Sequence, residues 1–170
     1  MIMEPERYIF DGKIEIEPNC RIGYVSQFSG LDKTKDTTVF EYIGEEFIKL
    51  QNEITSICAE METSADIDTL LEKYQQTLDA FQAIDGDNFE SNIEKKLNLA
   101  NLSKQADLKV SNLSGGEFKL IQVIKVMLTS PDLMIMDEPD VFLDFENLNS
   151  LKNLINSHKG ILLILSLIHI

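Results

Sequence analysis

Two short stretches in the second half of the chain decide how the sequence folds. The first is "LSGGE", residues 113–117, and the second is "LMIMDEP", residues 133–139. The first stretch has the pattern of a capped helix start, with a serine three residues before a glutamate. The second is an apolar run, typical of a strand buried on both faces, that ends in two carboxylates and a proline. Together they predict a helix followed by a parallel strand of an α/β sheet.

The helix start carries features that an ordinary helix does not need. The Ser114 hydroxyl can accept a hydrogen bond from the first helical turn, and Glu117 can accept one in return. Gly115 and Gly116 lie inside that turn, where glycine lowers helix stability. The same glycines let a phosphate from outside approach the backbone N–H groups at the positive end of the helix. Taken alone, the stretch is also compatible with an ordinary capped helix.

Polar side chains follow two predicted strands. Asp137 and Glu138 end the apolar run, at the strand end where α/β sheets bind ligands. Asp137 is suited to hold Mg²⁺ through water, and Glu138 can orient or polarise an attacking water. Gln27 closes "RIGYVSQ", residues 21–27, where a neutral amide could ligate the same ion. Without the other motifs, a glutamine in this place is commonly plain polar surface.

The middle of the chain changes to a helical period. Apolar residues recur every three or four positions from Ile43 to Met61 and again from Leu71 to Ile84, with a polar break at 64–66. This pattern predicts an antiparallel helical hairpin over about residues 41–88. Residues 8–16 predict a β-hairpin that turns at Asp11-Gly12. We also expect helices from Phe89, over about 115–128 and over about 145–157, the last ended by Gly160, and a buried strand from residue 161.

Composition and charge limit the classes of function. The 170 residues are 44% hydrophobic and 26% charged, as in one globular domain. Residues 41–95 hold fourteen acidic side chains against three lysines and carry −11 of the net charge of −14. Such a segment is typical of a well-solvated, self-repelling helical face, and we expect no direct nucleic-acid binding by the insert. Two cysteines form no cluster, no signal peptide is recognisable, and the C-terminal apolar run is too short for a bilayer, so a cytoplasmic protein is expected.

The motifs carry a family resemblance. Gln27, residues 113–117 and residues 134–139 resemble the Q-loop, signature and Walker B motifs of ATP-binding cassette (ABC) proteins, and residues 143–144 resemble the end of the D-loop. The resemblance spans about residues 8–164 and implies ATP and Mg²⁺ as cofactors. It implies Glu138 as the catalytic residue, and Gln27 and Asp137 at the magnesium ion. Ser114, Gly115 and Gly116 would contact ATP held by a second cassette.

The helical insert between the Q-loop and the signature motif is similar to that of the F subfamily. Members of that subfamily lack membrane domains, carry two cassettes in one chain, and act on ribosomes as translation or antibiotic-resistance factors. The resemblance implies a partial ABC-type P-loop ATPase domain over residues 1–164, from the first cassette, with the insert at 41–88 and the signature and Walker B part at 89–164. Three alternatives stay open: a transporter's nucleotide-binding subunit, a short non-catalytic protein that binds a partner cassette, and a relative of the coiled-coil DNA-repair ATPases.

The sequence departs from the family pattern at both ends. The 170 residues contain no G-x-x-x-x-G-K-[ST], so we expect the phosphate loop upstream of Met1. The strand leading into that loop is expected beside residues 133–136, which would leave one edge of this strand open and the domain loosely packed. Residues 165–170, "LSLIHI", replace the expected Ser/Thr-His pair, and His169 is not expected to be catalytic. They match the translation of CTG TCT CTT ATA CAC ATC, which resembles a transposon end used in sequencing libraries, so we expect a non-native tail.

Residues 140–142 and Leu120 are smaller departures. Asp140-Val141-Phe142 stand where Thr-Asn-His is common in the D-loop, so polar contacts between cassettes are expected to differ. Leu120 stands where a basic residue is frequent in the signature helix.

The missing phosphate loop gives a direct prediction. The 170-residue chain alone is expected neither to bind ATP tightly nor to hydrolyse it, because nothing in it cradles the β- and γ-phosphates. Isothermal titration with Mg²⁺-ATP up to roughly millimolar concentration should give no saturable heat, since weak single contacts fall in that affinity range. A clear saturating isotherm would contradict the prediction.

Overall fold

The computed structural model describes residue 13, residues 15–27 and residues 36–166. The β-hairpin expected at 8–16 falls mostly outside these residues. In chain order the elements are β1 (Ile22–Val25), α1 (Val39–Ile43), α2 (Glu45–Met61), α3 (Ile67–Ala83), α4 (Phe89–Leu99), α5 (Gly115–Leu128), β2 (Leu133–Asp137), α6 (Phe145–Ser157) and β3 (Ile161–Leu165). Short 3₁₀ turns at Gly86–Asn88, Ser103–Gln105 and Val110–Asn112 connect them. The α/β class predicted from the sequence is confirmed.

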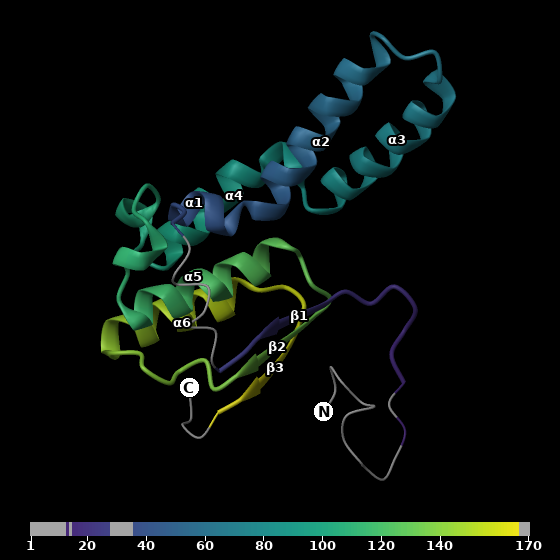
Figure 1. The fold of residues 1–170 in the computed structure, drawn as a ribbon. Coiled ribbons are helices and arrows are strands. Elements are labelled where there is room, and N and C mark those ends of the chain that lie inside the picture. Colours follow the sequence, from purple (N-terminus) through teal and green to yellow (C-terminus); the bar gives the residue numbers. More distant parts are fainter. Residues whose placement is uncertain (1–12, 14, 28–35, 167–170) are drawn as a thin grey trace.

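The three strands form a parallel sheet in the order β1-β2-β3. Ile22 pairs with Leu133, and Leu133 in turn pairs with Ile161, so the strands end at the same edge of the sheet. Helix α5 leads into β2, and α6 connects β2 to β3. Because such crossovers are right-handed and the strand order advances in one direction, α5 and α6 lie on the same face of the sheet (Figure 1).

The core lies between that face and the helices. Met134 and Met136 are fully buried in the central strand, and Leu120, Ile121 and Ile124 cover them from α5. Gly23 of β1 lets α5 come close, because a Cβ there would lie 2.5 Å from Val126 Cγ1. Burial of one large aliphatic side chain contributes about 1.5–3 kcal/mol, so this layer supplies much of the stability of the fold.

Helices α2 and α3 form the predicted antiparallel hairpin and project away from the sheet (Figure 1). Its base is packed: Phe47 stacks on Phe89 at 4.9 Å between ring centroids and lies 5.6 Å from Phe81. The tip of the hairpin is less well packed, since Ile67 and Leu71 are 39% and 50% exposed. The apolar stripe is therefore buried at the base and stays accessible toward the tip. Gly44 separates α1 from α2, so the first predicted helix is two helices.

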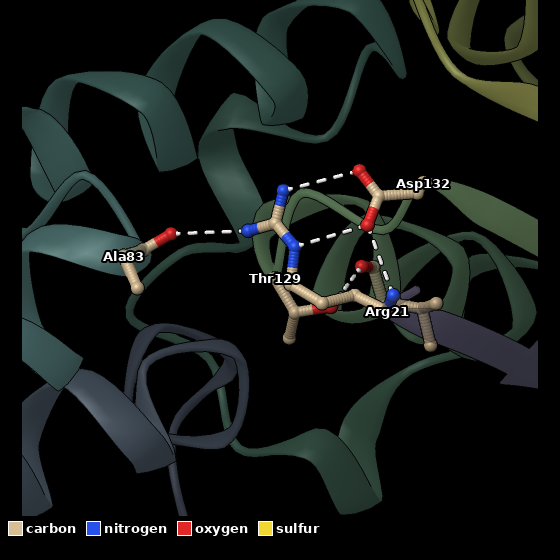
Figure 2. Close-up of polar contacts among 5 residues, drawn as sticks. Arg21, Ala83, Thr129 and Asp132 are labelled. Atoms are coloured by element: carbon tan, nitrogen blue, oxygen red, sulfur yellow. Dashed lines mark hydrogen bonds and ion pairs between the residues drawn. The ribbon is translucent and has the colours of Figure 1, made fainter. Parts of the chain in front are cut away.

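Arg21 connects the hairpin to the sheet (Figure 2). Its guanidinium donates to the Ala83 carbonyl at the end of α3 at 3.3 Å, and to both carboxylate oxygens of Asp132 at 3.4 Å. The backbone N–H of Arg21 donates to the same carboxylate at 2.9 Å, and this bond is the main cause of the lowered pKa of Asp132. Arg21 thus links three segments, which are the end of α3, the residue before β1 and the residue before β2.

Three expectations about strand edges, strand burial and helix ends are wrong. The strand of residues 133–136 has no open edge, because β2 pairs with β1 on one side and β3 on the other. Strand β3 lies at the sheet edge of the described chain and is only partly buried, not buried as expected. Helix α6 is capped by His158 and not by Gly160. Gly160 is required for another reason: a Cβ there would lie 2.8 Å from the Pro131 carbonyl oxygen.

The close approach at Gly160 gives a stability prediction. Gly160→Ala should lower the free energy of unfolding by about 1–3 kcal/mol, because the added methyl meets backbone that cannot move aside cheaply. Urea denaturation followed by far-UV circular dichroism measures the change. Gly115→Ala is the matched control, since a Cβ at Gly115 meets nothing within 4 Å. Equal stability of the two variants would contradict the prediction.

Candidate functional site

The ends of β1 and β2 bring three of the predicted site residues together. The Gln27 side-chain amide donates a short hydrogen bond to the Glu138 carboxylate. Asp137 is the last residue of β2, directly before Glu138. The Tyr24 hydroxyl reaches the Asp137 carboxylate at 3.5 Å, a weak contact across the two strands. Residues 111 positions apart thus meet at the carboxyl edge of the sheet, as the sequence predicts.

The backbone at Glu138 is in an uncommon conformation. Its φ is +44°, in the left-handed region that residues with a Cβ seldom adopt. The conformation is held by a bond of 2.7 Å from the Glu138 N–H to the Leu165 carbonyl of β3. Residues held in such conformations cost about 1–3 kcal/mol and concentrate at functional sites. The strain turns the chain sharply after β2 and aims the carboxylate at Gln27.

Lys119 is a member of this site that the sequence reasoning missed. Its side chain is buried, and Nζ donates to the Ser26 carbonyl at 2.6 Å, one residue before Gln27. Burial lowers the pKa of Lys119, and the nearby carboxylates of Asp137 and Asp140 raise it. The ammonium therefore connects the signature helix to the Q-loop backbone and balances two acids. Its position on an otherwise apolar helix face was the available signal.

Ser114, Gly115 and Gly116 lie at the start of α5, as predicted. The capping box is confirmed: Glu117 N–H donates to Ser114 Oγ at 3.1 Å, and Ser114 N–H donates to Glu117 Oε2 at 2.8 Å. Gly116 is packed, since a Cβ there would lie 2.6 Å from Asn147 Nδ2. Gly115 has open space around it and needs no unusual φ, so nothing in the described part of the chain requires a glycine at this position. An approaching ligand is the remaining physical use for it.

Ser114 lines a pocket that does not include Gln27. An open pocket of about 640 Å³ includes Ser114, Glu117 and the start of α6 around Asp144 and Asn147. None of Gln27, Asp137 and Glu138 lines it. The structure therefore holds two separate sets of predicted site residues, which is the arrangement expected when each set serves a different nucleotide.

The segment between β2 and α6 joins the two sets. Asp140 is buried and accepts a hydrogen bond of 2.8 Å from Ser166 Oγ. Asp144 caps α6 by accepting from the Asn147 N–H at 2.8 Å. Phe142 and Phe145 between and beside them are 75% and 78% exposed. Two large apolar side chains so exposed are typical of a surface that meets another protein.

The donor set at the strand ends fits magnesium that is held mainly by water and phosphate. Asp137, Glu138 and Gln27 supply carboxylate and amide oxygens, the ligands that Mg²⁺ prefers. Among the described residues, no cluster of three or more His, Cys, Asp or Glu side chains could enclose a metal ion. The site therefore has too few protein ligands for a closed cage and suits an ion that a nucleotide brings.

Comparison with known proteins places the chain in a family. The family described as ABC transporter matches residues 6–141. The chain belongs to this family of ATP-binding cassette proteins. No helix in the described part of the chain is long and apolar enough to cross a membrane.

Two curated relatives are translational throttle proteins. The chain is 30% identical over 155 residues to the energy-dependent translational throttle protein EttA of Haemophilus influenzae. The matched residues cover 89% of this chain and 27% of that protein. EttA of Mycobacterium tuberculosis is 31% identical over 157 residues, which cover 90% of this chain and 27% of the relative. These relatives bear out the resemblance to the F subfamily. The chain thus spans about a quarter of the length of the relatives that it matches.

Other similar proteins carry transporter names. The ABC transporter ATP-binding protein YfmM of Bacillus subtilis is 27% identical over 174 residues, covering 96% of this chain and 32% of YfmM. Among solved structures, a metal-chelate type ABC transporter in an inward-facing conformation gives a TM-score of 0.50 at 20% identity, covering 89% of this chain and 51% of that one. The structural likeness shows the ABC ATPase fold and nothing finer.

The position of Lys119 gives a prediction for the site. Lys119→Met should lower the free energy of unfolding by about 1–3 kcal/mol, because Asp140 and the Ser26 carbonyl lose a buried cationic neighbour. Asp140→Asn in the same chain should offset part of that loss, since the uncompensated charge is removed. Urea denaturation of both single variants and the double variant measures the coupling. Strictly additive changes would contradict a link between Lys119 and Asp140.

Proposed function

We propose that the chain is the part of the first cassette of an ABC-F ATPase that runs from the Q-loop to the Walker B motif, and that the intact protein hydrolyses ATP to act on the ribosome. The observation that carries the catalytic part is the pairing of Gln27 with Glu138 next to Asp137. The ribosomal part is supported by the relatives named as translational throttle proteins and by the helical insert between the Q-loop and signature motifs.

In the proposed reaction Glu138 is the catalytic residue. Its carboxylate, held on the strained turn after β2, accepts a proton from or orients the water that attacks the γ-phosphate. Magnesium, when bound with ATP, spreads the charge that develops on the phosphate oxygens. Asp137 and Gln27 hold the ion from the ends of two neighbouring strands. Gln27 also touches Glu138 directly, so the amide can report on whether a phosphate is present.

Ser114, Gly115 and Gly116 act on a second nucleotide in this proposal. They present the amino end of α5, and the open space at Gly115 lets a phosphate reach its N–H groups. That nucleotide is held by the phosphate loop of the second cassette, which we propose for the same parent chain. The exposed Phe142 and Phe145 lie beside this surface in the segment that would face the partner cassette.

A transporter subunit is the second candidate. The transporter-named relative YfmM favours it. The two readings differ in the partner of the cassette, which is a ribosome in one case and a membrane domain in the other. The packed base and accessible tip of the α2–α3 hairpin favour a reaching element over a compact transporter subdomain. Antibiotic resistance is one possible outcome of a ribosomal function and depends on the ribosomal site.

The test uses the intact parent protein. Glu138→Gln should lower the ATP hydrolysis rate about 10²–10⁴-fold, because a general base is removed while the shape is kept. ATP binding should persist, so the variant should sediment with ribosomes in ATP and not in ADP. Glu90→Gln, which removes an exposed acid from α4, is the matched control and should leave hydrolysis unchanged.

The two parts of the proposal fail separately. Unchanged hydrolysis in Glu138→Gln would remove Glu138 from the catalytic role. Loss of hydrolysis without ATP-dependent sedimentation would keep the ATPase and exclude the ribosome as its partner, in favour of the transporter reading.

A further inference from the structure

A second pocket lies at the edge of the sheet opposite the candidate site. Its walls come from the residues just before β2 and β3, from α4 and from the end of α5. The pocket has a volume of about 710 Å³ and is open to the surface. It is lined by Lys95, Lys96, Asp132, His158 and Lys159, among others. Each strand between the two sites rises about 3.3 Å per residue, so this pocket is separated from Gln27 and Glu138 by the length of the sheet.

The charge of this pocket is opposite to that of the chain. Three lysines line it in a molecule whose net charge is −14. The carboxylate in its lining is that of Asp132, which is already engaged by Arg21 (Figure 2). Asp85 lies near Lys95 but accepts from Asn88 and Asn92 at 2.9 and 2.8 Å. The acids at this place are thus partnered, while the lysines leave a local positive charge.

Lys96 is the least exposed of the three lysines and has no ion-pair partner among the described residues. It is half-buried, and desolvation lowers its pKa. Nζ donates to Ser157 Oγ at 2.7 Å, and that hydroxyl in turn donates to the Leu154 carbonyl at 2.7 Å. Among the described residues the ammonium makes no other hydrogen bond, and no carboxylate of these residues lies within ion-pair distance of it. An ammonium has three donors, and partly buried charges are usually paired, so two donors are available to an anion.

His158 adds a second unsatisfied group to the same wall. Its Nε2 is buried and has no hydrogen-bond partner among the described residues. Burial and the neighbouring Lys96 both lower the pKa of the imidazole. Uncompensated buried polar atoms in native proteins call for an explanation, and a missing ligand or water is one of them. Lys96, with donors to spare, and the unsatisfied His158 nitrogen belong to residues that line the same pocket.

We propose that this basic pocket binds a phosphate group, with Lys96 as the central ligand and Lys95 and Lys159 at the mouth. The lining suits phosphate because ammonium groups can share the acceptor oxygens of a phosphate and neutralise its negative charge. The source that we assign is the backbone of an RNA strand, since the pocket is open and the two outer lysines are exposed. The choice of RNA rests on the proposed ribosomal function, whereas the phosphate chemistry does not. The pocket lies outside most of the acidic insert, which is still expected not to bind nucleic acid.

The first experiment tests the phosphate chemistry on the 170-residue chain. Titration with inorganic phosphate, followed by heteronuclear NMR, should shift the signals of α4 and of residues 157–161. Lys96→Met should abolish these shifts, with far-UV circular dichroism confirming that the helices remain. The double variant Lys95→Gln, Lys159→Gln changes only exposed side chains and should weaken the phosphate-induced shifts. No shifts up to tens of millimolar phosphate, or equal shifts in all variants, would overturn the proposal.

The second experiment separates the two sources of phosphate. Fluorescence anisotropy with a labelled 12-nucleotide single-stranded RNA should show binding that the Lys95→Gln, Lys159→Gln double variant weakens about tenfold. The slope of log K against log salt should fall by about 1.4 in that variant, at about 0.7 per phosphate contact. Lys49→Gln with Lys104→Gln removes two exposed lysines elsewhere and should change neither quantity. Phosphate binding without RNA binding would overturn the RNA assignment and leave a small phosphate compound as the ligand. Neither experiment depends on ATP hydrolysis or on ribosomes.

Discussion

The parallel pairing of β2 between β1 and β3 is the constraint on which the rest of the structure depends. It fixes the register of Leu133 with both neighbours, and therefore decides which side chains stand at the strand ends. Because all three strands run the same way, Gln27 and Glu138 emerge at one edge and Asp132 and Gly160 lie at the other. The two candidate sites are consequences of a single sheet register. A shift of one residue would turn Met134 and Met136 away from the helices and separate Gln27 from Glu138.

Helix α5 transmits this register to the signature motif. Its apolar side packs on the central strand, its Lys119 ammonium bonds the chain just before Gln27, and its first turn carries Ser114. Ser114 and Lys119 thus both belong to the amino-terminal part of one helix. The bond between Lys119 Nζ and the Ser26 carbonyl is 2.6 Å long and partly buried, so α5 and the chain before Gln27 are in direct contact. Lys119 therefore connects the helix that begins at Ser114 with the chain that leads to Gln27.

The sequence predicted the parts of the fold that depend on local chemistry. The capping box at Ser114 needs only a spacing of three residues, and the buried strand of β2 needs only a short apolar run. Gln27 and Glu138 could be placed together because parallel strands end at one edge of a sheet. The sequence failed where neighbours distant in the chain decide the outcome. The role of Gly160 depends on the Pro131 carbonyl 29 positions earlier, and the pairing of β2 on both sides depends on strand order, which no local pattern encodes.

The same distinction applies to the proposed phosphate pocket, which the net charge of the chain does not predict. The acidic residues are spread over the hairpin, where solvent screens them from one another. The lysines near the start of β3 are few, but Lys96 is partly buried between α4 and the end of α6. His158 beside it has a buried nitrogen with no partner among the residues that the structure describes. A charge out of water interacts more strongly with a ligand than a larger number of solvated charges does. What determines where this acidic chain can hold an anion is therefore the burial of one ammonium, not the sign of the whole.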